Sequence, residues 1–290
     1  MANAGTDGAG AGVVARIRSA ADALTPVDRR VADVVAADPQ LVAFGTVAEV
    51  AKKAGASGAS VVRLAGRLGY KGFVELQDAV RGELSDRLRP AAVRIRDLEP
   101  GDVLARAMTT SAQAVEATLS GLDRAVFDEA VALLSDRKRR VVVLAGDAGA
   151  GIAGHAGDEL RMLRSDVDVI SGTPVAVGQA IARLDPGDVV LALDLRRYDR
   201  WLLQAVDHAV GEGAVLIALT DGPLSPLARL SRCLLVVEGE GIGPFDNYVG
   251  ALALLAALVA AVAEELRDDA TGDLDRVERT WQALDALTDG

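Results

Sequence analysis

TVAEVAKKAGASGASVVRLAGRLGYKGF (residues 46–73) predicts two short helices joined by a glycine turn. Thr46 is followed three residues later by Glu49, which is the spacing of a capping box at a helix start. Gly55 supplies the left-handed residue that commonly ends a helix, and Ser57 can cap the helix that follows. Two capped helices around a tight turn are typical of a helix-turn-helix, whose second helix enters the major groove of DNA. A helical hairpin within a bundle is the alternative interpretation.

The second of these helices is amphipathic. Val61 and Leu64 belong to its apolar side. Ser60, Arg63 and Arg67 fall together on the opposite side. Arginine pairs bidentately with guanine and hydroxyl groups contact either base, so this side carries groups that read base edges. The predicted DNA-binding residues are Thr46, Lys52, Ser57, Ser60, Arg63, Arg67 and Lys71.

Four stretches in and around this motif follow one another in a fixed order: LTPVDRRVAD (24–33), FGTVAEVA (44–51), SGASVVRL (57–64) and LGYKGFVEL (68–76). Together they resemble the N-terminal domain of the RpiR family of bacterial sugar-responsive transcription regulators. The resemblance covers about residues 13–90. It implies an all-α domain that binds double-stranded operator DNA.

The charges of the chain are unevenly placed along its 290 residues. Residues 1–96 hold 14 basic and 10 acidic side chains, whereas residues 97–290 hold 17 basic and 32 acidic ones. A mildly basic front on an acidic body suits a protein that touches a polyanion through one module only. The distribution therefore agrees with DNA binding by the N-terminal part.

Short apolar runs alternate with helical patterns after residue 139, which predicts parallel strands joined by helical crossovers. The runs are VVVLA (141–145), VDVI (167–170), VVLAL (189–193), VLIAL (215–219) and LLVV (234–237). We expect an α/β doubly wound domain with a five-stranded parallel sheet. Such sheets bind ligands beyond the carboxyl ends of their strands, at loops that here start at Gly146, Ser171, Asp194 and Thr220.

Four stretches of this part carry a second resemblance: LDPGDVV (184–190), AVLIALTD (214–221), SPLARL (225–230) and PFDN (244–247). They resemble the SIS (sugar isomerase) domain, which in the RpiR family follows the DNA-binding domain and senses a phosphosugar. The resemblance spans about residues 102–270. It implies a sugar-derived effector and a homodimer or tetramer, and hence a near-palindromic operator.

The two loops that hold the phosphosugar in that family depart from its pattern here. The first reads GDAGAG (146–151) and lacks the usual hydroxyl residue. In the second, DLRRYD (194–199), Asp194, Arg196 and Asp199 stand at the places of three hydroxyl residues, and Arg197 stands at a glycine. Carboxylates repel a phosphate, whereas arginines clamp an anion.

Two interpretations of these loops remain open. One is a pocket retuned for a carboxylate or a polyol, and the other is a salt-bridged loop in a sensor that has lost its ligand. The predicted effector-binding residues are Gly146, Asp147, Gly149, Asp194, Arg196, Arg197 and Thr220.

Enzyme and cofactor functions find little support in the sequence. GAGIAG (149–154) matches the dinucleotide pattern G-x-G-x-x-G, but the acidic residue expected at the end of the next strand is missing. His155, His208 and Cys233 are the only residues of their kinds and form no metal-ligand or catalytic spacing. A sugar-phosphate isomerase of the same fold is the alternative, with Asp194 as its acid or base. We expect a non-enzymatic regulator without metal or cofactor.

The predicted organisation is a disordered tail (1–12), a helix-turn-helix domain (13–90), a linker (91–101) and a SIS-like domain (102–290) that senses the effector and dimerises. The first twelve residues lack the positive charge and the apolar run that are typical of a signal peptide, and the longest apolar run, residues 249–263, is shorter than the roughly 20 residues that span a bilayer. We therefore expect a cytoplasmic protein that does not enter membranes. Helices are predicted over residues 13–23, 26–37, 73–88, 103–120, 124–135 and 249–263.

Overall fold

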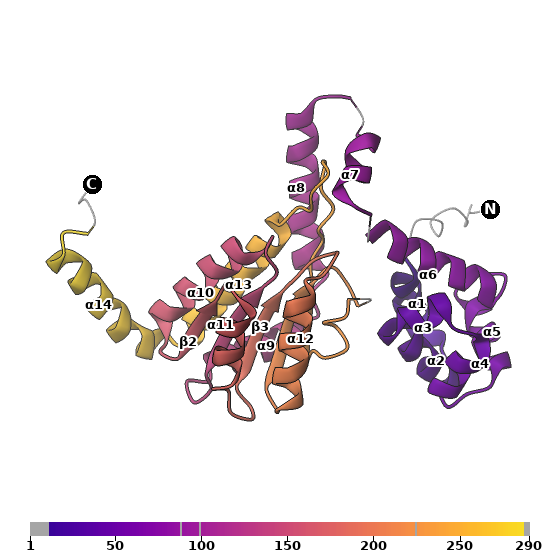
Figure 1. Cartoon of the computed structure of the whole chain (residues 1–290), viewed down its shortest axis with the longest axis horizontal. Coiled ribbons are helices and arrows are strands. Elements are labelled where there is room, and N and C mark those ends of the chain that lie inside the picture. Colours follow the sequence, from indigo (N-terminus) through magenta and orange to yellow (C-terminus); the bar gives the residue numbers. More distant parts are fainter. Residues whose placement is uncertain (1–11, 88, 99, 224, 287–290) are drawn as a thin grey trace, which may run out of the picture. The chain divides into compact units, whose positions relative to one another are not determined.

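The computed structural model describes residues 12–87, 89–98, 100–223 and 225–286 of the chain (Figure 1). Its contacts divide into two compact units, Met1–Arg89 and Pro90–Gly290. Apart from Gly12, the predicted N-terminal tail lies outside the described residues. The predicted linker, residues 91–101, falls within the second unit, where it contains a helical turn.

The first unit contains helices only, in the part that the structure describes. They are α1 (Val13–Ala20), the 3-10 turn η1 (Ala21–Ala23), α2 (Pro26–Ala37), α3 (Pro39–Phe44), α4 (Val47–Lys53), α5 (Gly58–Arg67) and α6 (Phe73–Arg87). The helix predicted over residues 13–23 thus tightens into a 3-10 turn at its end. Pro39 begins α3, because a proline at the first helical position has no N–H to leave unpaired.

Apolar side chains from every long helix of the first unit form one core. It is built around Val31, Val35, Val50, Leu64 and Leu76, all fully buried. The helices begin where the sequence indicates, because Thr25 with Asp28 and Thr46 with Glu49 both form complete capping boxes. Local capping rules therefore position the helix-turn-helix.

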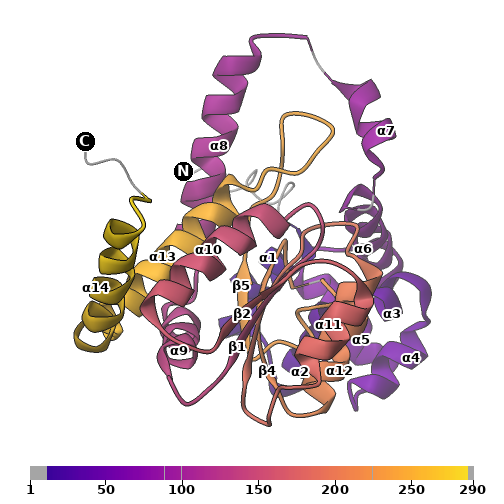
Figure 2. The same cartoon turned by 60° about the vertical axis from the view of Figure 1, so that its left-hand side comes forward.

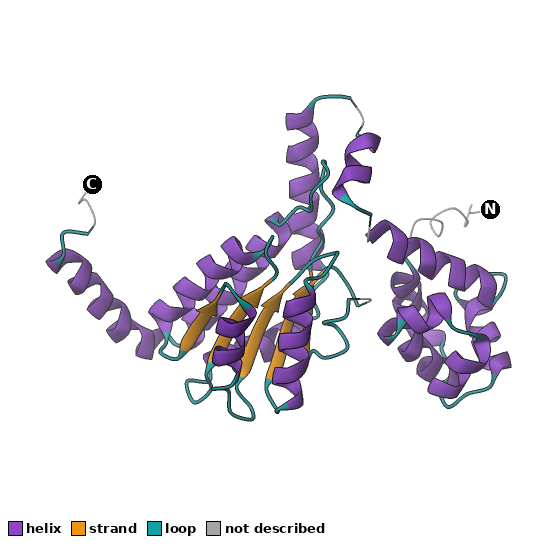
Figure 3. Cartoon of the chain, viewed as in Figure 1, coloured by secondary structure: helices purple, strands orange, loops and turns teal. Residues whose placement is uncertain are grey.

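The second unit is a five-stranded parallel sheet with helices on both faces (Figure 3). It begins with α7 (Ala91–Arg94), the 3-10 turn η2 (Ile95–Asp97), α8 (Val103–Ser120) and α9 (Arg124–Ser135). The strands are β1 (Val141–Ala145), β2 (Val167–Ile170), β3 (Val189–Leu193), β4 (Val215–Thr220) and β5 (Cys233–Val236). Between and after them lie α10 (Ala150–Leu163), α11 (Pro174–Ile181), α12 (Arg200–Gly211), α13 (Val249–Glu265) and α14 (Arg267–Ala283).

Two helical layers bury the sheet (Figure 2). One face packs against α9, α10 and α13, and the other packs against α11 and α12. Val141 and Val143 belong to the first core, whereas Val142 and Leu144 belong to the second. Burial on both faces explains why the central strands read as unbroken apolar runs.

The apolar helix predicted over residues 249–263 is α13, and it is only partly enclosed. Leu254, Leu258 and Val262 are buried against the sheet, but Val249 and Leu252 are both 41% exposed. Among the described residues, no single helix is long and apolar enough to cross a membrane. The pair formed by α13 and α14 passes that test of length and composition together, with a bend of 105° between the two helices.

The strand order is β2-β1-β3-β4-β5. The connections therefore run in opposite directions from β1 and from β3, which are neighbouring strands. Such a switch point is where open α/β sheets bind their ligands.

Candidate DNA-binding and effector sites

Three short-range hydrogen bonds cap the starts of α4 and α5. The Thr46 backbone N–H donates to Glu49 at 2.7 Å, and the Glu49 N–H donates back to the Thr46 hydroxyl at 3.3 Å. Gly55 adopts a φ of +56°, which a residue with a side chain resists. The Ser57 hydroxyl then accepts the N–H of Ser60 at 3.3 Å and begins α5. Thr46 thus caps the start of α4, and Gly55 and Ser57 shape the turn that leads into α5.

Ser60 differs from its expected position. It is 4% exposed and faces inward, so its placement on the exposed side of the helix was wrong. The reason lies in its hydroxyl, which is 3.0 Å from the Ser57 hydroxyl and accepts a hydrogen bond from the Arg63 guanidinium at 2.8 Å. The buried Ser60 hydroxyl therefore orients the guanidinium of Arg63, which is exposed.

Arg67 is held by the first unit's own core. Its guanidinium lies 2.6 Å from the carboxylate of Asp28 on α2 and donates to the Ala23 carbonyl at 3.2 Å. The hydrogen bond from the Thr25 side chain lowers the pKa of the buried Asp28 carboxyl, and the charges of Arg67 and Arg63 lower it further. Arg67 thus joins α5 to α2, a role that the helical pattern of the sequence does not reveal.

The remaining predicted DNA-binding cations, Lys52 and Lys71, are both exposed. Sequence reasoning missed Val62, which is 45% exposed beside Arg63 on α5. An apolar side chain at this place suits the methyl group of thymine. The sequence signal for its exposure is that Val62 lies next to Arg63 and outside the apolar side of α5 formed by Val61 and Leu64.

The loops after β1 and β3 meet at the carboxyl edge of the sheet. Asp194 is 5% exposed and accepts the backbone N–H of Asp199 at 2.7 Å. The carboxylate of Asp199 accepts the backbone N–H of Asp147 at 2.7 Å. A Cβ at Gly146 would lie 2.5 Å from an Asp194 oxygen, so only glycine fits there. Burial raises the pKa of the Asp194 carboxyl to about 7, and the charge of Asp199 adds to the increase.

The two arginines of the β3 loop have left-handed backbones, with φ of +27° at Arg196 and +45° at Arg197. The Arg196 guanidinium forms an ion pair with Glu240 and lies 3.6 Å from Asp246, and Arg197 is exposed. Arg196 therefore already has carboxylate partners within the chain. This arrangement does not fit the anion clamp that the sequence suggested for Arg196.

The other predicted effector residues lie close to the two loops. Thr220, at the end of β4, is fully buried and its hydroxyl donates to Ser225 at 2.8 Å. The following residue, Asp221, accepts the hydroxyl of Tyr198 at 2.6 Å. A Cβ at Gly149 would meet Leu193 at 3.1 Å, so this glycine allows the β1 loop to pack on β3.

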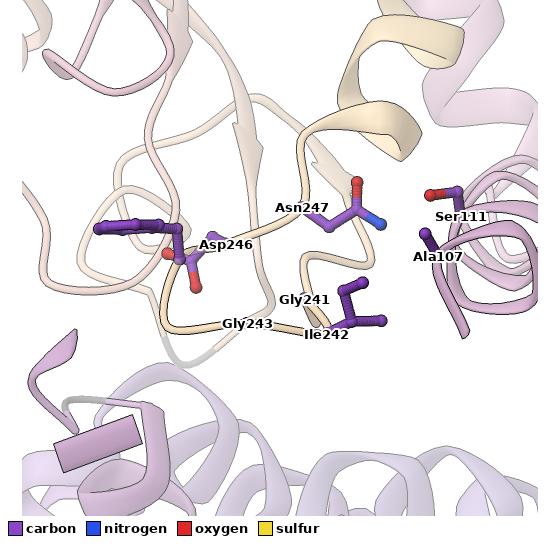
Figure 4. Close-up of a pocket in the computed structure, with 8 residues that line it drawn as sticks. Ala107, Ser111, Gly241, Ile242, Gly243, Asp246 and Asn247 are labelled. Carbon is purple, nitrogen blue, oxygen red and sulfur yellow. The ribbon is translucent and has the colours of Figure 1, made fainter. Parts of the chain in front are cut away.

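A pocket of about 270 Å³ lies next to these loops (Figure 4). One wall is the segment from Gly241 to Asn247, between β5 and α13, and the other wall is Ala107 and Ser111 of α8. Asp246 lines it and also accepts a hydrogen bond from Arg94 of α7 at 2.7 Å. Sequence reasoning included residues 244–247 in a resemblance but did not assign them to a site.

Two family models match the chain. A model described as "Helix-turn-helix domain, rpiR family" matches residues 11–87, and a model of the SIS domain matches residues 133–261. The chain belongs to the RpiR family.

A similar relative of this RpiR-family protein is an uncharacterized HTH-type transcriptional regulator of Haemophilus influenzae. The two are 26% identical over 267 residues, which cover 88% of this chain and 92% of the relative. The domain pair and the relatives make the protein a transcriptional regulator that binds DNA.

Two solved structures resemble the regulator's fold. The sugar isomerase domain of an RpiR transcription factor from Sphaerobacter thermophilus is 26% identical, with a TM-score of 0.58 over 62% of this chain and 99% of that one. The Vibrio vulnificus NanR protein, complexed with ManNAc-6P, is 21% identical, with a TM-score of 0.54 over 94% of this chain and 99% of that one. The second likeness shows the fold alone.

The histidines and the cysteine lie away from these sites. His155 is 3.5 Å from Glu159 on α10, and His208 lies on α12 beside Trp201 in a separate pocket of about 250 Å³. Cys233 is buried in β5, and burial raises the pKa of its thiol to about 11. Among the described residues, no group of three or more His, Cys, Asp or Glu side chains is arranged to hold a metal ion.

Proposed function

We propose that the regulator senses a small sugar-derived molecule at the carboxyl edge of its sheet and thereby controls the affinity of its N-terminal domain for operator DNA. The observation that carries this proposal is the meeting of the β1 and β3 loops at the switch point of the sheet, where Asp147, Asp194 and Asp199 converge. The NanR protein, which has a similar fold, is complexed with a sugar derivative, ManNAc-6P. In this proposal, residues 13–90 bind DNA and residues 102–290 sense the effector.

On the DNA side, Lys52, Arg63 and Lys71 are the proposed contacts. Each is exposed, and Arg63 is oriented from below by Ser60. Val62 adds an apolar contact on the same face. Thr46, Ser57, Ser60 and Arg67 support this surface through caps and the ion pair to Asp28.

Arg94 is the proposed route of communication. It lies on α7, five residues after the end of the first unit at Arg89, and pairs with Asp246 in the pocket wall. Asp246 is also 3.6 Å from Arg196 of the β3 loop. A ligand that moves the β3 loop therefore changes the contacts of Asp246 and, through Asp246, those of Arg94. Allosteric control requires such a difference in contacts between two states of a protein.

The proposed assembly is a cytoplasmic homodimer or tetramer. One recognition helix reads only a few base pairs, so a near-palindromic operator with half-sites roughly 34–36 Å apart, or a multiple of that, is expected. Leu104 and Met108 on α8 are 82% and 73% exposed, and they offer apolar surface for self-association. Light scattering at micromolar concentration tests the assembly, and a monomer would contradict it.

Sensing without catalysis is the expected behaviour, although the Asp194 carboxyl, with a pKa of about 7, is suited to proton transfer. Incubation with sugar phosphates, followed by product analysis, separates the two functions. Conversion that Asp194→Asn abolishes would establish an isomerase-like activity instead.

The central experiment measures operator affinity by fluorescence anisotropy across a panel of neutral sugars, sugar acids and sugar phosphates. We expect one class of compound to change the affinity of the full-length protein for operator DNA. We also expect this affinity to fall steeply with salt concentration, because lysine and arginine side chains displace counterions from the DNA phosphates. In Arg94→Ala the ligand should still bind but should lose its effect on DNA. The proposal fails if no compound of the panel changes operator affinity in the wild type.

A further inference from the structure

Asp199 stands at the N-cap of α12, yet its side chain makes no capping hydrogen bond to that helix. An aspartate in this position ordinarily accepts an N–H from the first turn of its own helix. Here the carboxylate instead accepts the N–H of Asp147, 52 positions earlier in the chain, at 2.7 Å. The side chain is thus diverted from its local role to the loop after β1.

The N–H that Asp199 occupies belongs to the turn that leads into α10. Backbone N–H groups before a helix, at the carboxyl end of a strand, attract anionic groups of ligands. The Asp199 carboxylate lies where such a group would lie. A Cβ at Gly146 would be 3.0 Å from its oxygen and 2.5 Å from an oxygen of Asp194, so both carboxylates rest directly on this turn.

The surrounding charges do not favour a second anion. Asp194 is buried beside Asp199, and Asp221 is engaged by the hydroxyl of Tyr198. On the β3 loop, the Arg196 guanidinium is paired with Glu240 and approaches Asp246, and Arg197 is exposed. A phosphate entering this turn would have to displace the Asp199 carboxylate and would meet the buried carboxyl group of Asp194 beside it.

We propose that Asp199 is a built-in anion that fills the anion position of the proposed effector site at the β1 and β3 loops, and that this site therefore excludes phosphate and carboxylate ligands. Neutral polyhydroxyl compounds remain as the ligand class, because carboxylate oxygens accept hydrogen bonds from their hydroxyl groups. This inference rests on the proposed function, since it specifies the ligand of the same site. It narrows the sequence-based choice between a carboxylate and a polyol to the polyol.

The test is a gain of anion binding. Calorimetry with inorganic phosphate and glucose 6-phosphate compares the wild type, Asp199→Ser and Asp199→Asn in the full chain. Serine is itself a good N-cap, so α12 should remain folded, which circular dichroism verifies. We expect Asp199→Ser to bind both probes at least about tenfold more tightly than the wild type, a change of about 1.4 kcal/mol. Asp199→Asn should gain less because its amide still fills the turn.

Asp207→Ser is the matched control, because Asp207 is an exposed carboxylate on the same helix, 3.5 Å from Arg229. It removes the same charge without touching the turn and should gain no affinity. Micromolar binding of either probe by the wild type, or a folded Asp199→Ser protein that gains nothing, would overturn the inference. These titrations contain no DNA, so a failure of effector control in the operator assay leaves their outcome intact, and the reverse also holds.

Discussion

The exposed side of α5 and the loops at the carboxyl edge of the sheet use their charges in opposite ways. On α5, Arg63 is turned outward by Ser60 and remains exposed. At the sheet edge, Asp199 accepts an N–H of the β1 loop and Arg196 is paired with Glu240. The first surface presents charge to a partner, whereas the second satisfies its charges internally.

This difference teaches that the role of a charged residue can be predicted from sequence when its partner lies nearby in the chain, but not when the partner is distant. Ser60 and Arg63 are three residues apart, so their contact follows from helical spacing. Asp199 and Asp147 are 52 residues apart, and no local pattern connects them. Substitutions can distinguish charges that are exposed to a partner from charges that are paired within the chain, and the largest effect is expected at Asp194.

Asp194→Asn should produce the largest change, in stability. The folded pKa of about 7 exceeds the ordinary value of 3.8, so between about pH 4 and pH 7 the folded state holds a proton that the unfolded state releases. The free energy of unfolding of the second unit should therefore fall as pH rises through this window, by up to about 4 kcal/mol. In Asp194→Asn this fall should disappear, and the variant should exceed the wild type in stability at pH 8.

Urea unfolding followed by tryptophan fluorescence measures this effect, because both tryptophans, Trp201 and Trp281, belong to the second unit. The advantage of the variant should shrink towards pH 5, which serves as an internal control. A constant difference at every pH would mean that Asp194 does not titrate in this range.

Arg63→Ala should weaken binding to a cognate operator by about 1–3 kcal/mol and relax base preference at one position, because an outward arginine reads a base edge. Competition with operator variants in the anisotropy assay measures both effects. Lys138→Ala, which removes an exposed charge from the second unit, is the control and should leave base preference unchanged. Undiminished selectivity in Arg63→Ala would place the arginine among the phosphate contacts.

Arg67→Ala should act on the fold of the first unit. It leaves the buried Asp28 carboxylate without its guanidinium partner, which should lower the free energy of unfolding by about 1–2 kcal/mol. Hydrogen exchange of the amides of α2 and α5 reports on this unit. Unchanged exchange together with lost operator affinity would show that Arg67 contacts DNA directly.

Two glycines of the helix-turn-helix test rules of backbone conformation that involve no charged partner. Gly55→Ala should destabilise the first unit by about 1 kcal/mol, because an alanine resists its φ of +56°. Gly66→Ala lies within α5, where a Cβ would meet nothing within 4 Å, and should stabilise by about 0.5–1 kcal/mol. Both are read by hydrogen exchange, and equal signs would contradict the assignment of the turn.

Most of the fold was predictable because its signals are local. Thr46, Gly55 and Ser57 bound the helix-turn-helix as expected, and the apolar runs became the five parallel strands with shifts of one residue at β4 and β5. The inward turn of Ser60 and the α2 partner of Arg67 were not predictable, since helical periodicity places a residue within one helix but does not identify its neighbour on another. The β3 loop was predicted to be part of the effector site, but the internal partners of its charges depend on contacts that only folding creates.

The contact of Asp199 with the β1 loop, in place of a capping bond to α12, also bears on which substitutions such a regulator can accept. Because that helix starts without help from the Asp199 side chain, position 199 is released from a structural duty that most N-caps carry. If Asp199 fills the anion position as proposed, we expect a change of this one residue to alter the ligand class of the site while α12 stays folded. Position 199 is accordingly the place at which we expect a biosensor built on this protein to be convertible from one effector chemistry to another.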